Sequence, residues 1–120
     1  MELPVLHAQC DRCAGLCCVL LPYSRQDGFA ADKPGGVPCR NLDPHDLCTF
    51  HDRLSSSGWR GCVRFDCLGA GQQVTQVTYG GQGWRAQENL AEMGAVLSTM
   101  RQLHEVLALL EAARTHRTGA

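Results

Sequence analysis

The chain of 120 residues lacks the features of a membrane protein or a secreted protein. No apolar run approaches the roughly 20 residues that a membrane-spanning helix needs. Residues 1–9 have neither the basic start nor the apolar stretch of a signal peptide. We therefore expect a single cytoplasmic domain with no contact with a membrane.

The sequence also has little net charge, −1 at pH 7. A balanced charge produces no basic field that would attract nucleic acid, so the composition argues against nucleic-acid binding. The chain holds no HExxH motif, no Ser–His–acid order and no recognisable pair of carboxylates. These absences favour a role other than catalysis.

Cysteine, in contrast, is abundant and clustered. Four of the eight cysteines fall within residues 10–18, and the other four follow as two looser pairs. Because cytoplasmic thiols stay reduced, we expect this set to bind metal rather than to form disulfides. All eight are candidate metal ligands: Cys10, Cys13, Cys17, Cys18, Cys39, Cys48, Cys62 and Cys67.

The spacing of the cysteines suggests how they share a metal. Cys10 and Cys13 form a Cys-x2-Cys knuckle, whose short loop turns both sulfurs to the same side. Cys17 and Cys18 are neighbours, so we expect their side chains to point apart. We also expect the first cluster to meet the downstream cysteines, with at least four sulfurs from both halves within roughly 4 Å of one another.

The spacing leaves the identity of the metal open. Zinc favours closed sites of four cysteines, or of three cysteines and one histidine, and iron–sulfur clusters also use four thiolates. His51 lies three residues after Cys48 and is a candidate ligand, although a packed or capping histidine fits the same position. A thiol–disulfide switch at Cys10 and Cys13 is a third interpretation, but no thioredoxin-like βαβ pattern surrounds it.

The remaining pattern predicts a small, α-rich, irregular, cysteine-rich metal-binding domain with a long C-terminal helix. We divide it into a cysteine-rich module over residues 1–84, a helix over residues 85–115 and a flexible tail over residues 116–120. The helix is rich in helix formers and has an apolar seam at spacings of three and four: Met93, Val96, Met100, Leu103, Leu107 and Leu110. One face should pack on the module, and the rest could contact a partner protein or a second copy.

Four shorter segments carry structural predictions. We expect a helical turn over residues 16–21, followed by an irregular, proline- and glycine-rich loop over residues 22–38 that packs Phe29 against the core. An Asp-Pro pair predicts the start of a helix over residues 43–58. Residues 74–79 favour a short helix over a strand, ended by two glycines.

The cysteine pattern resembles that of a known family. Cys10-x2-Cys13-x3-Cys17-Cys18 is followed by Cys39-Arg-Asn-Leu42, Cys48-Thr-Phe-His51 and Cys62-x4-Cys67-Leu-Gly-Ala-Gly71. The whole is similar to the bacterial CxxCxxCC, or YkgJ-like, family of zinc- or iron-chelating domains. It is most similar to the cysteine modules at the N-terminus of some pentapeptide-repeat proteins, over about residues 7–110.

The resemblance implies metal binding through these cysteines in a structural, sensing or partner-docking module, with zinc or an iron–sulfur cluster as the cofactor. A flagellin lysine methylase carries a similar module. The alternative is therefore an iron–sulfur redox protein, or an accessory to a modifying enzyme such as a methylase. This sequence has three residues between Cys13 and Cys17 where the family's name has two, so the ligand geometry can differ.

Overall fold

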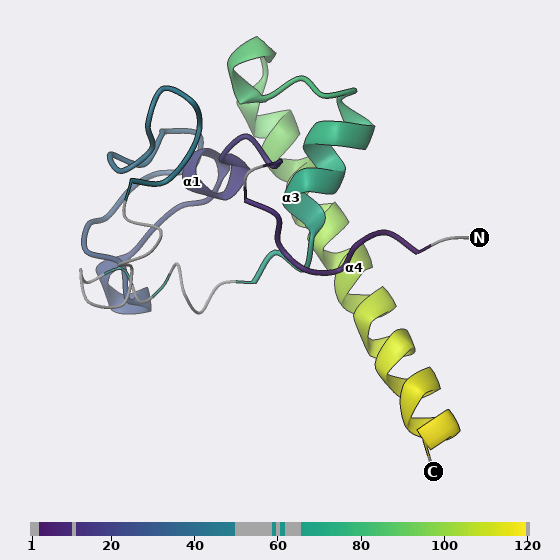
Figure 1. The fold of residues 1–120 in the computed structure, drawn as a ribbon. Coiled ribbons are helices and arrows are strands. Elements are labelled where there is room, and N and C mark those ends of the chain that lie inside the picture. The colour runs from purple at the N-terminus through teal and green to yellow at the C-terminus, as the bar shows by residue number, and fades with distance from the viewer. Residues whose placement is uncertain (1–2, 11, 50–58, 60, 62–65, 120) are drawn as a thin grey trace.

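The chain folds as short helices packed against one long helix. The computed structural model describes residues 3–10, 12–49, 59, 61 and 66–119. The helices among them are α1 (Leu16–Leu20), η1 (Arg25–Asp27), α3 (Ala70–Gln73), η3 (Val74–Thr78), η4 (Trp84–Ala86) and α4 (Leu90–Gly119). These residues form no strand, only isolated bridges from Tyr23 to Lys33 and from Leu42 to Cys48. The prediction of a helix-rich domain with a long C-terminal helix is confirmed (Figure 1).

The long helix α4 begins at Leu90, later than the predicted start at residue 85. Asn89 supplies the start signal, because its side-chain oxygen accepts the amide of Glu92 at 3.0 Å. The helix then runs to Gly119 with no proline to interrupt it, so it includes most of the predicted tail. Neither α4 nor any other helix in the described part of the chain is long and apolar enough to cross a membrane.

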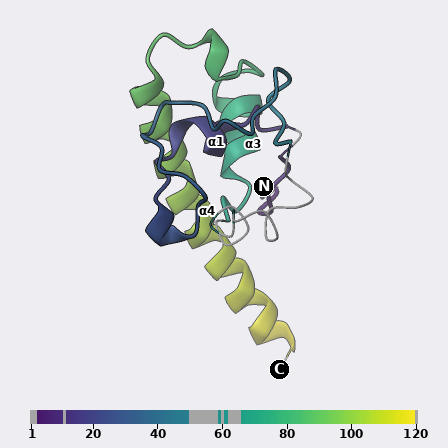
Figure 2. The same ribbon diagram turned by 90° about the vertical axis from the view of Figure 1, so that its left-hand side faces the viewer.

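The main core lies where α1, α3 and η3 meet the first half of α4. Met93 and Leu97 of α4 are four residues apart and buried, as expected for one face of a helix. The second half of α4 extends beyond the other elements in both views (Figures 1 and 2). The buried members of this core are Leu16, Val19, Leu20, Ala70, Val74, Met93 and Leu97.

A second, smaller cluster supports the irregular loop over residues 22–38. The ring of Phe29 stacks on Tyr23 with ring centres 4.2 Å apart, and Trp59 meets Tyr23 edge-on at 6.1 Å. Cys39 is buried in the same cluster. The prediction that Phe29 packs against the core is therefore confirmed.

The predicted helix over residues 43–58 is wrong in the part that the structure describes. Residues 43–49 form a turn instead. The carboxylate of Asp43 accepts the amides of His45 at 2.7 Å and of Leu47 at 3.0 Å. This local bonding competes with helix formation, which is why Asp favours turns and caps. The other residues of the predicted helix lie outside the described residues.

The predicted short helix near residues 74–79 is confirmed, as the continuous segment α3 and η3. Its second half is widened, with the amide of Tyr79 donating to the carbonyl of Val74 at 2.9 Å. Gly80 and Gly81 follow with φ of 63° and 90°. Glycine reaches this left-handed region without strain, so the pair ends the helix as expected.

Candidate metal centre

Side chains of α3 and η3 fix the N-terminal segment that carries the first two cysteines. The hydroxyl of Thr75, which is buried, donates to the carbonyl of Cys13 at 2.8 Å. Gln72 and Gln76 donate to other backbone carbonyls of residues 7–12, also at 2.8 Å. Residues three and four apart lie on one face of a helix, so a single polar face directs the course of this segment.

The side chains of Cys13 and Cys67 both lie near Gly71 in α3. A side-chain carbon placed on Gly71 would lie 2.9 Å from Cβ of Cys13, 3.6 Å from its Sγ and 3.9 Å from Sγ of Cys67. Cβ of Cys13 therefore packs directly on the helix backbone, which only glycine allows, while the two sulfurs lie at ordinary contact distance from the same point. This arrangement brings the first cysteine cluster near the downstream cysteines.

A second contact between the two halves lies at α1. The amide of Cys39 donates to the carbonyl of Cys18 at 2.8 Å, and the amide of Gly36 donates to the carbonyl of Val19 at 2.8 Å. These bonds return the loop over residues 22–38 to the helix from which it leaves. Closing such a loop costs chain entropy, so a firm contact between its ends is needed.

Among the described residues, the cysteines do not gather into one cluster of metal ligands. No group of three or more His, Cys, Asp or Glu side chains there has an arrangement that could hold a metal ion. Cys62 and His51 lie outside the described residues, so the predicted four-sulfur centre stays a prediction. The described cysteines form no disulfide with one another, with Cys10 exposed and Cys13 and Cys39 buried.

The side chains of Cys17 and Cys18 do not point apart, contrary to expectation. They share a hydrogen bond, which lowers the pKa of Cys18 to about 7. The same bond, together with burial, raises the pKa of Cys17 well above its usual value. Adjacent side chains of a helix diverge by only about 100°, which does not separate two short thiols.

Burial also raises the pKa of two other thiols, those of Cys13 and Cys39. It raises the pKa of Cys13 to about 11, and the nearby thiols of Cys10 and Cys67 add to the increase. Burial also raises the pKa of Cys39. Cys13 and Cys39 are therefore protonated at neutral pH and must lose a proton to bind a metal.

Lys33 places a positive charge beside the cysteines of α1. Its Nζ donates to the carbonyls of Val19 at 3.1 Å, Leu21 at 2.6 Å and Pro34 at 3.0 Å, and it lies 4.7 Å from the centre of the Tyr23 ring. The residue is only 9% exposed. A buried ammonium is stable only where its donors are satisfied, which these three carbonyls achieve.

The charge of Lys33 also acts on the thiols. It opposes the burial that raises the pKa of Cys39, and it lowers the pKa of Cys18 together with the stronger effect of Cys17. Burial in turn lowers the pKa of Lys33 itself. Lys33 thus favours the negatively charged thiolate form of Cys18 and Cys39.

The sequence patterns alone did not single out Lys33 or His104. Lys33 is the chain's single lysine beside ten arginines, and that isolation was the available signal. His104 is 1% exposed and extends the buried stripe of Met93 and Leu97 at helical spacing. A histidine in an apolar stripe marks a polar contact inside the core.

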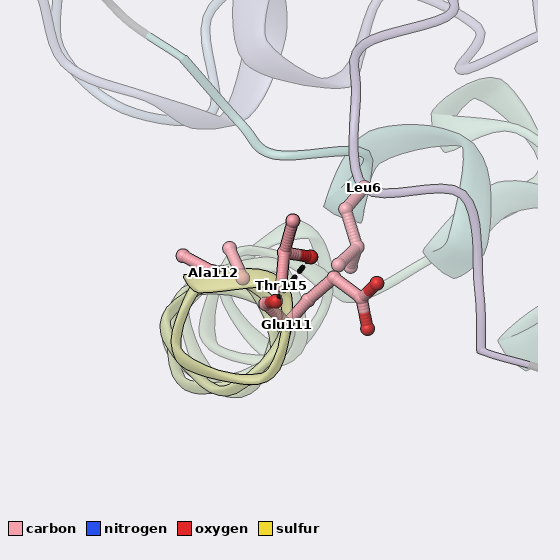
Figure 3. A pocket seen from close by; sticks show the side chains of 5 residues that line it. Leu6, Glu111, Ala112 and Thr115 are labelled. Carbon is pink, nitrogen blue, oxygen red and sulfur yellow. Dashed lines mark hydrogen bonds between the residues drawn. The ribbon is translucent and has the colours of Figure 1, made fainter. Parts of the chain in front are cut away.

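A shallow hollow lies away from the cysteines, between Leu6 and the last turns of α4 (Figure 3). The residues of α4 that line it are Ala108, Glu111, Ala112 and Thr115. Thr115 donates its hydroxyl to the carbonyl of Glu111 at 2.9 Å. The hollow contains no cysteine or histidine, so it is separate from the candidate metal ligands.

Comparison with known proteins gives one similarity. No family model matches the chain, and no solved structure matches it. The chain is 49% identical over 109 residues to the uncharacterized protein YybG of Bacillus subtilis (strain 168). The match covers 90% of this chain but 39% of that protein, so the chain spans about two fifths of its relative's length.

Proposed function

We propose that the chain is a metal-binding module of the YkgJ-like kind, in which cysteines hold zinc or an iron–sulfur cluster. The observation that supports this is that cysteines from both halves lie near one another: the side chains of Cys13 and Cys67 lie near Gly71, and the backbones of Cys18 and Cys39 are hydrogen-bonded. Thiolates are the ligands that zinc and iron–sulfur clusters prefer. The proposed role is structural, sensing or partner-docking.

The surroundings of the thiols fit a thiolate-bound metal. The absence of a side chain at Gly71 lets Cys13 pack against α3, near Sγ of Cys67. Lys33 supplies a positive charge near Cys18 and Cys39, which offsets part of the negative charge that metal-bound thiolates carry. The residues that would hold the metal are drawn from Cys10, Cys13, Cys17, Cys18, Cys39, Cys48, Cys62 and Cys67.

A bound metal would cross-link segments that have a limited core of their own. A domain of 120 residues buries a moderate share of its surface, and the loop over residues 22–38 contributes few apolar side chains. Because the thiols are brought together only in the folded chain, the free energy of metal binding adds directly to the free energy of folding. The proposal therefore explains how an irregular chain with short helices holds a defined structure.

Purification without oxygen, followed by metal analysis and visible spectroscopy, tests the proposal. We expect stoichiometric metal that Cys13→Ser and Cys67→Ser lose, whereas Ser98→Ala, on an exposed position of α4, retains it. A brown protein with visible absorption would identify an iron–sulfur cluster and favour the redox or methylase-accessory alternative. A colourless protein with zinc would favour the structural role, and folded, reduced, metal-free wild type would contradict both.

We infer a second role for α4, which is self-association of two copies through its second half. Leu103, Val106 and Leu110 follow one another at spacings of three and four, and each is more than half exposed. The neighbouring charges are neutralised within the helix by the pairs Arg101–Glu105 and Arg114–Glu111. A second copy would therefore meet an apolar seam without charge repulsion.

A further inference from the structure

The short loop that carries Cys67 is held by side chains of α4. Nε of Arg101 donates to the carbonyl of Asp66 at 3.0 Å. Nδ1 of His104, one helical turn further, donates to the carbonyl of Leu68 at 2.7 Å. The two carbonyls flank Cys67 on either side, so α4 grips the backbone immediately before and after this cysteine.

The contact fixes a proton on Nδ1 of His104. A carbonyl oxygen only accepts, so Nδ1 must be the donor in this bond. Within the described residues, Nε2 is buried and has no hydrogen-bond partner. Burying an unpaired polar atom costs about 1–3 kcal/mol, so an apolar side chain would serve simple packing better. The bond from Nδ1 is therefore the contribution that distinguishes this histidine from a leucine.

The backbone of the loop is shaped to receive these bonds. Leu68 has φ of 55°, a left-handed conformation that a leucine rarely adopts, and Gly69 follows with φ of 82°. The Asp66 carboxylate accepts the amide of Leu68 at 2.9 Å, and the carbonyl of Cys67 accepts the amide of Ala70 at 2.9 Å. A strained residue persists only where its surroundings determine it, and strain of this kind concentrates at functional sites.

We propose that Arg101 and His104 are positioning residues that hold Cys67 in place beside Cys13, so that α4 forms part of the cysteine site. This inference rests on the proposed metal-binding function. Removing a residue that bonds to a metal ligand and orients it commonly weakens metal affinity by 10–100-fold. Arg101 and His104 act on Cys67 through its backbone and are not ligands themselves.

Two substitutions at His104 separate positioning from packing. His104→Leu keeps apolar volume but removes the donor to Leu68. His104→Asn loses volume but places an amide nitrogen close to the position of Nδ1. If the donor matters, the Leu variant should bind Co²⁺ at least about tenfold more weakly with altered thiolate bands, while the Asn variant retains the spectrum. If volume alone matters, the Asn variant should be the weaker one, and that result would overturn the proposal.

Hydrogen exchange in the protein as purified gives a readout that does not depend on metal. The amides of Leu68 and Ala70 should exchange roughly tenfold faster in His104→Leu and in Arg101→Ala than in wild type. Glu105→Gln, which removes the negative charge next to Arg101 on α4 but not the bond from Arg101 to Asp66, is the matched control and should leave these amides protected. Unchanged exchange in His104→Leu would show that α4 does not hold the loop.

The two measurements also distinguish the failure of this proposal from the failure of the proposed function. If wild type shows the expected exchange but binds Co²⁺ without thiolate bands, metal binding by the cysteines is wrong and the contact from α4 is only structural. If wild type shows thiolate bands and both His104 variants match it in affinity and exchange, metal binding stands and the positioning role is wrong.

Discussion

Gly71 allows Cys13 to pack closely on α3, near Cys67. Gly71→Ala would favour helix by about 1 kcal/mol through propensity alone. Its new Cβ, however, would lie 2.9 Å from Cβ of Cys13, which is closer than side-chain carbons approach. We expect the substitution to displace Cys13 and to weaken metal binding by at least roughly tenfold, as measured by competition with a chromophoric chelator.

The matched control is Gly94→Ala in α4. The nearest atom to a Cβ there is Cβ of Leu20, at an ordinary contact distance of 4.0 Å. This variant should gain about 0.5–1 kcal/mol in free energy of unfolding and keep the metal affinity of wild type. Equal metal affinities in the two glycine variants would show that the space over Gly71 is not part of the site.

Lys33 illustrates a second residue whose importance comes from burial. Lys33→Met keeps the aliphatic length but leaves the carbonyls of Val19, Leu21 and Pro34 without their shared donor. We expect a loss of about 2–4 kcal/mol in free energy of unfolding, since bonds to charged donors exceed neutral ones. Denaturant titration measures it. Arg25→Met, an exposed position in the same loop, should change stability by less than about 0.5 kcal/mol.

At the scale of the element, α4 has two halves with different environments. Leu97 is 3% exposed and lies in the main core, whereas Leu103 is 53% exposed. Leu97→Ala should cost about 2–5 kcal/mol of stability, and Leu103→Ala should cost less than about 1 kcal/mol in the monomer. Thermal or denaturant unfolding compares the two. Similar losses at both positions would place the second half of the helix against other parts of the chain.

The second half of α4 also provides the test of self-association. Leu103→Glu introduces charge into the seam and should shift a dimer to monomer in light scattering, with little change in monomer stability. Ser98→Glu, which introduces the same charge at an exposed position in the first half of α4, is the control and should leave the oligomeric state unchanged. A wild-type chain that stays monomeric at high concentration would contradict self-association.

At the scale of the whole molecule, metal should decide whether the chain folds. Structural zinc contributes on the order of 10 kcal/mol in small modules, which is comparable to the total stability of a domain. Treatment with a strong chelator under reducing conditions should therefore abolish cooperative unfolding, as followed by near-UV circular dichroism. Retention of the native spectrum after complete metal removal would show that the apolar core suffices.

Metal affinity should also rise with pH. Cys13, with a pKa of about 11, and Cys39, whose pKa is also raised by burial, carry protons at neutral pH that a metal must displace. Each displaced proton makes binding tighter as pH increases, and other ligand thiols with an ordinary pKa also carry protons, so we expect at least about two protons released per metal between pH 7 and 8. Cys18, with a pKa of about 7, should add to this dependence only at lower pH. A pH-independent affinity would remove Cys13 and Cys39 from the ligand set.

The sequence by itself determined that the chain carries clustered thiols and where the long helix α4 lies. The density of cysteines and the spacing of helix formers are local properties, so they can be read without a fold. The turn at residues 43–49 shows the limit of that reading. There the carboxylate of Asp43 accepts hydrogen bonds from nearby amides, and a segment with a helical pattern forms a turn instead.

Only the tertiary structure decided which thiols meet and which polar side chains are buried. Cys13 reaches Cys67 because Thr75 holds the first segment on α3 and η3 and because Gly71 lacks a side chain, two conditions set by distant residues. Lys33 and His104 became important through the carbonyls around them. Spacing along a chain defines a face but not what that face meets, so contacts of this kind arise only on folding.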